Sequence, residues 1–158
     1  MADSNSLPDC LNAAYYYLGY RPRSEGEIRH WLHRRGFAEE VVEEAITKLR
    51  EQNLSDDFAF AQFWKDNRLS FRPKSKRMIE KELRQKKVAA EIVEQVTEDM
   101  DDEEIAYKLG CGRMSALAHL DYADFYRRLS GYLAYRGFSY PVIRDTAARL
   151  WREKDTNG

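Results

Sequence analysis

Apolar residues along this chain recur at the spacing of helix faces, and one arrangement of them occurs three times. In each copy two aliphatic residues lie four positions apart, and such residues share one face of an α-helix. A second helical pattern follows after a short break, as in Val42, Ile46 and Leu49. The spacing therefore predicts helices rather than strands. The three aliphatic pairs are Ile28 and Leu32, Ile79 and Leu83, and Leu129 and Leu133.

This pattern belongs to a longer internal repeat. Residues 20–24 read Tyr-Arg-Pro-Arg-Ser and residues 71–75 read Phe-Arg-Pro-Lys-Ser, which places the same motif at an offset of 51. The hydrophobic positions downstream keep this offset. A third copy follows at an offset near 50 from the second, and its Gly137-Phe138 matches Gly36-Phe37 of the first. A fixed period of this length is typical of helical repeat proteins, whose units complete a core by stacking.

We therefore predict an all-α fold of three tandem three-helix repeats that form an elongated, curved array. The repeats are expected at residues 9–53, 54–100 and 101–153. A stretch in the third repeat, residues 111–120, has no counterpart in the other two and is predicted to be irregular. The expected helices are 9–19, 24–35 and 38–52, then 56–70, 74–87 and 89–99, and finally 101–110, 121–136 and 139–153.

Capping signals support these boundaries. Ser24 with Glu27 three residues later forms a capping-box pattern at the start of a helix. Gly36 and Gly137 suit the left-handed position that ends a helix. The second repeat has Lys87 at this position, so its turn is expected to differ or to carry strain.

Composition fits a folded chain with a sizeable core. Hydrophobic residues make up 43% and charged residues 34%. No apolar run approaches the roughly 18 residues that a membrane helix needs, and the N-terminus has no signal-peptide pattern. The two cysteines, Cys10 and Cys111, do not make a disulfide framework. We interpret them as reduced thiols of a cytoplasmic protein that has no membrane segment.

No set of residues forms a persuasive catalytic, metal or cofactor site. The chain lacks phosphate-binding glycine loops and the HExxH pattern. His30 and His33 lie three apart on a predicted helix, but no cysteine or carboxylate at zinc spacing joins them. The acidic pairs Asp56-Asp57 and Asp101-Asp102 stand where helices start, so capping explains them better than acid–base chemistry. We expect no enzyme activity, no catalytic residue and no cofactor.

Charge is strongly segregated along the chain although the net charge is −1. Residues 65–87 contain ten basic and three acidic side chains, and residues 89–104 contain eight acidic side chains and no basic one. Several basic residues also recur at equivalent places in the repeats. The candidate binding residues are Arg21, Arg23, Arg35, Arg68, Arg72, Lys74, Lys76, Arg77, Arg84, Lys86 and Lys87, with Lys81 on the same predicted helix as the middle group.

Two interpretations of this basic surface stay open. It is either an ordinary solvated face or a surface that meets phosphates or an acidic protein. The run of tyrosines at residues 15–17 adds a possible stacking contact to single-stranded bases, although we expect two of the three rings to pack inside. The concentration of positive charge favours binding.

Three sequence blocks resemble the RecX family of small bacterial proteins. The first is Arg-Pro-Arg-Ser-Glu-Gly-Glu-Ile at residues 21–28, followed by Gly36-Phe37 and Glu39-Glu40-Val41. The third block is Arg-Gly-Phe-Ser-Tyr at residues 136–140, followed by Val-Ile at residues 142–143. The second block matches at Asp56-Asp57, Phe60-Ala61, Arg68, Pro73, Ile79, Glu82-Leu83, Lys86 and Val88.

The resemblance spans roughly residues 9–152, and it departs from the family pattern where Arg72 and Lys87 replace glycines. It implies a protein that binds along the groove of the RecA filament on DNA and interferes with filament growth, ATP hydrolysis, strand exchange and repressor cleavage. It implies RecA as partner, with DNA bound directly or through RecA, and no cofactor. We expect a monomer. The alternative is a helical-repeat protein that binds DNA without RecA.

Overall fold

The computed structural model describes residues 6–157, and this part of the chain contains helices and no strand. They form three successive sets of three, which confirms the predicted all-α fold of tandem three-helix repeats. The helices are α1 (Leu7–Leu18), α2 (Glu25–Arg34), α3 (Glu39–Glu51), α4 (Asp57–Phe71), α5 (Lys76–Gln85), α6 (Ala90–Thr97), α7 (Asp102–Leu117), α8 (Tyr122–Tyr135) and α9 (Tyr140–Asn157).

One predicted element is wrong. Residues 111–117, expected to be irregular, continue helix α7. The expectation took Gly110 for a helix end, but this glycine lies buried in mid-helix against α9. A Cβ placed on Gly110 would come within 2.4 Å of Leu150 Cδ1. The glycine therefore permits close packing of two helices and does not break one.

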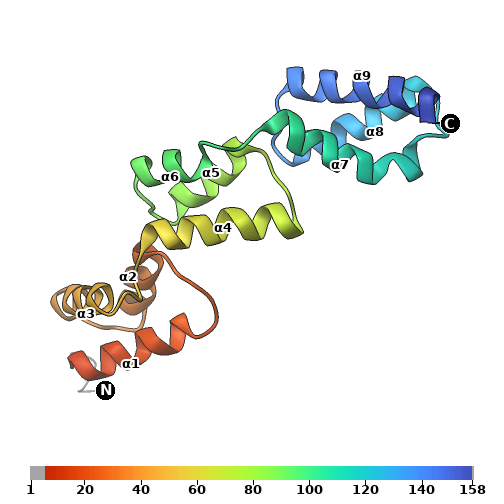
Figure 1. The fold of residues 1–158 in the computed structure, drawn as a ribbon. Helices are drawn as coiled ribbons and strands as arrows, with labels where there is room; N and C mark the ends of the chain where they lie inside the picture. The colour runs from red at the N-terminus through yellow and green to blue at the C-terminus, as the bar shows by residue number, and fades with distance from the viewer. Residues whose placement is uncertain (1–5, 158) are drawn as a thin grey trace. The chain divides into compact units, whose positions relative to one another are not determined.

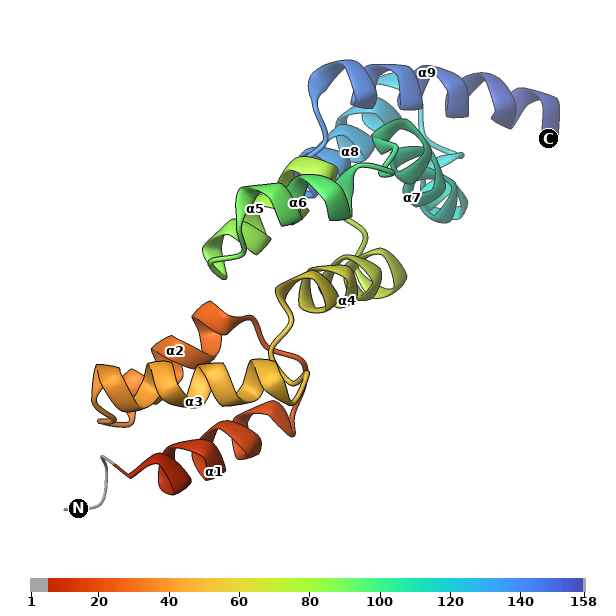
Figure 2. The same cartoon turned by 60° about the vertical axis from the view of Figure 1, so that its left-hand side comes forward.

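The fold divides into two compact units, and the second three-helix set contributes to both. The first unit extends through Asp66 and includes Glu82–Val96, and the second comprises Asn67–Lys81 and the chain from Thr97 onward. Figures 1 and 2 show α1, α2 and α3 packed together in the first unit, and α7, α8 and α9 packed together in the second.

The core of the first unit contains the hydrophobic positions that the repeat predicts. Its centre is a cluster from α1, α2 and α3 in which every side chain is fully buried. Burial of each large aliphatic side chain stabilises the fold by about 1.5–3 kcal/mol. The cluster comprises Cys10, Ala14, Ile28, Leu32, Val42, Ala45, Ile46 and Leu49.

The second unit has an equivalent core built from α7, α8 and α9. Phe125, Leu129 and Leu133 lie on one face of α8, at the spacing that the sequence predicts. Ile143 and Leu150 face them from α9, and Leu117, near the end of α7, completes one side.

The helix ends follow their capping signals. Gly36 and Gly137 adopt φ values of 95° and 93°, as predicted for left-handed helix ends. Lys87 takes the same role with φ 66°, which places a Cβ-bearing residue in a conformation that costs about 1–2 kcal/mol. Ser24 forms the complete capping box with Glu27. These ends position the residues described next.

Candidate partner-binding surface

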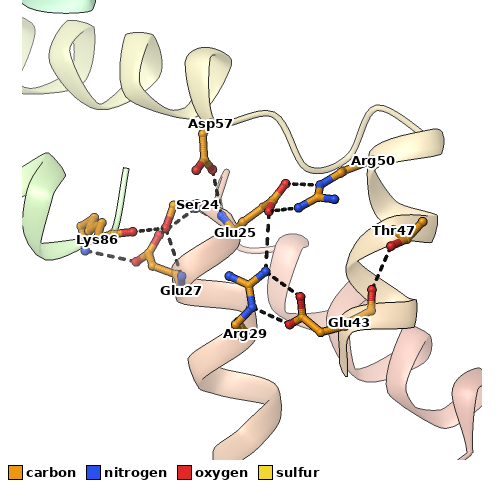
Figure 3. A network of polar contacts seen from close by, with 9 residues as sticks. All are labelled: Ser24, Glu25, Glu27, Arg29, Glu43, Thr47, Arg50, Asp57 and Lys86. Atoms are coloured by element: carbon orange, nitrogen blue, oxygen red, sulfur yellow. Dashed lines mark hydrogen bonds and ion pairs between the residues drawn. The ribbon is translucent and has the colours of Figure 1, made fainter. Parts of the chain in front are cut away.

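The start of α2 is the centre of a polar network within the first unit (Figure 3). Ser24 Oγ accepts the Glu27 N–H at 3.0 Å and donates to the Lys86 carbonyl oxygen at 2.6 Å. Glu27 in turn accepts from the Ser24 N–H at 3.1 Å and from Lys86 Nζ at 3.1 Å. One serine therefore caps its own helix and anchors the end of α5 from the next repeat.

Glu27 is the charged centre of this network. Its side chain is 12% exposed and forms a two-pronged ion pair with Arg21, with the shorter contact at 2.6 Å. Burial raises the pKa of Glu27, but hydrogen bonds from Arg21, the Ser24 amide and Lys86 outweigh this effect and hold the pKa below its ordinary value. Glu27 is therefore ionised and fully partnered at neutral pH.

Glu25 and Asp57 complete the contact between α2 and α4. Asp57 Oδ1 accepts the Glu25 N–H at 2.9 Å, so a carboxylate of one helix satisfies the first amide of another. Burial raises the pKa of Asp57, although this hydrogen bond opposes the shift. Figure 3 shows the Glu25 side chain turned toward Arg50, which donates to it at 2.6 Å. That ion pair lowers the pKa of Glu25.

The second unit contains the same junction one repeat later. The Ser75 N–H donates to the Arg136 carbonyl oxygen at 3.0 Å, and Ser75 Oγ accepts the Met78 N–H at 3.2 Å. Asp102 Oδ1 accepts the Lys76 N–H at 2.9 Å, as Asp57 does for Glu25. Each junction therefore joins the second helix of one repeat to the first and second helices of the next.

Each junction contains a glycine, but it lies on the capped helix in the first unit and in the left-handed turn in the second. In the first unit a Cβ on Gly26 would lie 2.4 Å from Lys87 Cβ, so the glycine of α2 makes room for a side chain at the left-handed turn. In the second unit the turn residue is Gly137, and a Cβ there would lie 2.0 Å from Met78 Cγ. At each junction only one of the two residues in contact can carry a side chain. The left-handed turn can therefore hold Lys87 where it faces Gly26, and it holds Gly137 where it faces Met78.

The junctions fix two corners, which we call the Arg21 corner (residues 20–24) and the Arg72 corner (residues 71–75). In the Arg21 corner both arginines make contacts within the unit. Arg21 pairs with Glu27 and its Cζ lies 5.4 Å from the Trp64 ring centroid. Arg23 Nε donates to the Tyr17 carbonyl oxygen, and its Cζ lies 3.9 Å from the centre of the Tyr17 ring.

The Arg72 corner leaves its arginine available. Within the described residues, Arg72 is exposed and its side chain forms no ion pair. The reason lies in the sequence: Met78 stands where the first unit has Glu27, and Leu109 of α7 stands where it has Trp64 of α4. Without the carboxylate and the aromatic ring, the Arg72 guanidinium has no ion-pair partner among the described residues and stays exposed to solvent.

Three further cations of the second unit share this state. Lys76, Arg77 and Lys81 lie on α5, and none of their side chains forms an ion pair within the described part of the chain. Arg77 and Lys81 are exposed and four positions apart, so they lie on one helix face. We call Arg72, Lys76, Arg77 and Lys81 the unpaired cation group. Such a group retains its full charge for a partner.

The other predicted binding residues have different surroundings. Lys86 belongs to the Glu27 network, and Arg35 is exposed with its Cζ 4.4 Å from the Trp31 ring centroid. Lys87 is exposed in the first unit, with its Cβ against Gly26. The remaining three each take part in at least one interaction and are therefore not counted as unpaired: Arg68, Lys74 and Arg84.

Two features of this surface differ from the sequence interpretation. Lys65, which opens the basic run, is 5% exposed and donates to the Val96 carbonyl oxygen at 3.0 Å, so it adds no surface charge. Among the tyrosines at residues 15–17, only Tyr17 packs inward, stacked on Trp31, while Tyr15 and Tyr16 are exposed. The expectation of two inward rings is therefore wrong.

The structure supplies no arrangement for metal binding in the part that it describes. No three potential ligands among histidine, cysteine and carboxylate side chains lie close enough to share a metal ion there. His30 and His33 are exposed on α2. Burial raises the pKa of Cys10 to about 11, which keeps that thiol protonated. None of the described helices is long and apolar enough to cross a membrane.

Comparisons with known proteins match this architecture. Three family models match in order: "RecX, first three-helix domain" at residues 10–49, "RecX, second three-helix domain" at 56–96 and "RecX, third three-helix domain" at 101–146. The crystal structure of RecX from Lactobacillus salivarius superimposes with a TM-score of 0.77 over 96% of this chain and 99% of that chain, at 24% identity. That likeness shows the fold.

Curated relatives extend the match to the sequence. Regulatory protein RecX of Chlorobium limicola is 32% identical over 152 residues, covering 96% of this chain and 95% of the relative. Regulatory protein RecX of Amycolatopsis mediterranei is 33% identical over 135 residues, covering 81% of this chain and 77% of the relative. The resemblance of the three sequence blocks is thus confirmed, as is the interpretation of the chain as a regulator and not an enzyme. The chain belongs to the RecX family of regulatory proteins.

Proposed function

We propose that this protein binds the RecA–DNA filament in the cytoplasm and inhibits the recombinase, ATPase and coprotease activities of RecA during recombination and the SOS response. The observation that carries the proposal is the unpaired cation group. Arg72, Lys76, Arg77 and Lys81 of the second unit form no ion pair within the described residues, whereas Arg21, the equivalent of Arg72, pairs with Glu27. A partner with acidic groups or phosphates on its surface fits this charge.

Membership of the RecX family supports RecA as that partner. We propose that the chain acts as a monomer, and that Arg72, Lys76 and Arg77 contribute most of the binding among the residues predicted from sequence. Arg21 and Lys86 act mainly by holding the repeats together, since their charges are already paired with Glu27 in the first unit.

The test is a titration of the protein into the single-stranded-DNA-dependent ATPase of the cognate RecA. We expect inhibition at substoichiometric amounts, because one regulator that stops filament growth affects many subunits. The triple variant R72E/K76E/R77E is expected to lose inhibition. Its matched control is R127E/R144E, which reverses two exposed arginines of the same unit that already pair with Asp124 and Asp145. No inhibition and no filament binding by the unchanged protein would contradict the proposal.

Direct DNA binding is the second candidate, because the unpaired cation group suits phosphates as well as carboxylates. It predicts binding to single-stranded DNA without RecA and a steep loss of affinity with salt. Neutralisation of four phosphates gives a slope of about −3 in a plot of log affinity against log salt concentration. Absence of a gel shift at low salt would exclude this candidate and leave filament binding as the function.

A further inference from the structure

Each unit carries a hollow at the same place in the repeat. The hollow of the first unit, about 480 Å³, is lined by Leu18, Pro22 and Phe60 among others. The hollow of the second unit, about 280 Å³, is lined by Leu69, Pro73 and Ile105 among others. Leu69 and Pro73 lie 51 positions after Leu18 and Pro22, the offset of the sequence repeat. The two hollows are therefore copies of one feature of the repeat.

Each corner also carries an exposed aromatic ring. Tyr20 is 68% exposed and lines the first hollow, while Phe71 is 77% exposed and directly precedes the Arg-Pro pair of the second. Tyr16 holds the Tyr20 ring edge-on, with 5.3 Å between the ring centroids. Aromatic and arginine side chains dominate the binding energy of protein interfaces. In each corner the aromatic-Arg-Pro motif therefore places an aromatic residue and an arginine directly before the proline that lines the hollow.

Each corner contains an arginine that forms no ion pair within the described residues. Arg23 lines the first hollow and has no carboxylate partner within the described residues, since it contacts only Tyr17. The adjoining Asp56 accepts the Ala59 N–H and so compensates the start of α4. Lys108 lines the second hollow but pairs with Glu104, so the available cation of that corner is Arg72, which directly follows Phe71 and forms no ion pair within the described residues. This combination selects a large apolar side chain that has a carboxylate beside it.

We propose that the Arg21 and Arg72 corners are equivalent docking sites. Each corner binds the same surface element, of which every filament subunit has one copy. Each corner would take a large apolar side chain of that element in its hollow and an adjacent carboxylate against its cation, so that one chain engages two subunits. This proposal rests on filament binding as the function and adds the surface and the chemistry of the contact. Duplication of the site matches a partner built of identical subunits, and two linked contacts raise the affinity well above that of either alone.

Truncation of the two rings tests the proposal. Tyr20→Ala, Phe71→Ala and the double variant are titrated against RecA filaments assembled on single-stranded DNA, with binding measured by co-sedimentation. We expect each single variant to lose about five- to tenfold in affinity and the double variant to lose about the product of the two. Tyr135→Ala is the control, since that ring is 84% exposed and lies outside both corners. The control should bind as the unchanged protein does.

Further outcomes separate this proposal from filament binding itself. If the double variant binds within about twofold of the unchanged protein while R72E/K76E/R77E does not bind, the docking corners are wrong and filament binding stands. If only one ring matters, the equivalence of the corners is wrong. If the unchanged protein does not bind filaments, both proposals are overturned. Thermal unfolding of every variant confirms that lost affinity does not reflect lost structure.

Discussion

The Arg21 and Arg72 corners share one sequence motif and one place in the repeat, yet they use their arginines in opposite ways. In the first unit Glu27 and the Trp64 ring engage Arg21, which becomes part of the structure. In the second unit Met78 and Leu109 stand at these positions, and Arg72 is exposed and forms no ion pair within the part of the chain that the structure describes. The comparison teaches that a recurring basic residue is a poor guide to binding until its acidic neighbour is known. Two exchanges, Glu27 for Met78 and Trp64 for Leu109, accompany the change from a structural cation to an available one.

The largest expected effect comes from making the first corner resemble the second. Glu27→Met leaves Arg21 and Lys86 without their carboxylate in a half-buried setting and should destabilise the protein by about 2–4 kcal/mol. The free energy of unfolding is measured by urea denaturation. Glu43→Gln is the control, because the Arg29–Glu43 pair is largely exposed and should contribute less than about 1 kcal/mol. Equal losses in both variants would contradict a special role for Glu27.

Because Gly26 makes room for Lys87 in the first unit, we predict that the effects of substituting these two residues on stability are coupled. Gly26→Ala places a Cβ against Lys87 Cβ and should cost about 1–3 kcal/mol despite the better helix propensity of alanine. Lys87→Gly removes that contact and relieves the positive φ, so the penalty of Gly26→Ala should fall in its presence, although the contact of the new Cβ with the Lys86 carbonyl oxygen at 2.9 Å remains. Gly112→Ala on α7, with open space around it, should be neutral or slightly stabilising. An unchanged penalty in the Lys87→Gly background would show that the two residues are not coupled.

The carboxylates that join neighbouring repeats predict a smaller effect. Asp57→Ala removes the acceptor of the Glu25 N–H and should destabilise the protein by about 1 kcal/mol. Asp57→Asn keeps an oxygen acceptor and removes a charge that burial disfavours, so it should be neutral. Urea denaturation of the two variants separates hydrogen bonding from charge. A loss in Asp57→Asn as large as that in Asp57→Ala would mean that the charge matters more than the hydrogen bond.

The smallest effect is a dependence of stability on acid. The pKa of Glu27 is lower in the folded protein, so its contribution is present above pH 4.5 and is lost as pH falls through the lowered pKa. Asp57 has a raised pKa and opposes this loss. The urea midpoint should therefore fall less steeply below pH 4.5 in Glu27→Gln than in the unchanged protein. Parallel curves would show that Glu27 does not contribute to acid sensitivity.

Much of the fold follows from the sequence because the apolar spacing and the helix-end signals agree with each other. Ile28, Leu32, Leu129 and Leu133 are buried as their spacing predicts. The failure at residues 111–117 has a physical cause, since a glycine that permits close helix packing and a glycine that ends a helix look alike in sequence. Only the contact of Gly110 with Leu150 distinguishes the two.

The candidate surface was less predictable, because ion pairing depends on contacts between distant segments. Sequence identifies the recurring basic residues but does not reveal that Lys86, from the next repeat, shares Glu27 with Arg21. It also gives no sign that Lys65 is buried. One signal was present: Met78 occupies the position of Glu27 in the aligned repeats, which indicates that Arg72 lacks the partner of Arg21.

The most direct test compares Arg21→Ala with Arg72→Ala in two assays, urea denaturation and binding to RecA filaments on single-stranded DNA. We predict that Arg72→Ala weakens binding about five- to tenfold and changes the free energy of unfolding by less than about 0.5 kcal/mol. Arg21→Ala should lose about 1–3 kcal/mol of stability while its folded form binds within about twofold of the unchanged protein. Equal effects of the two substitutions on binding, or the reverse pattern, would contradict the division into structural and available cations.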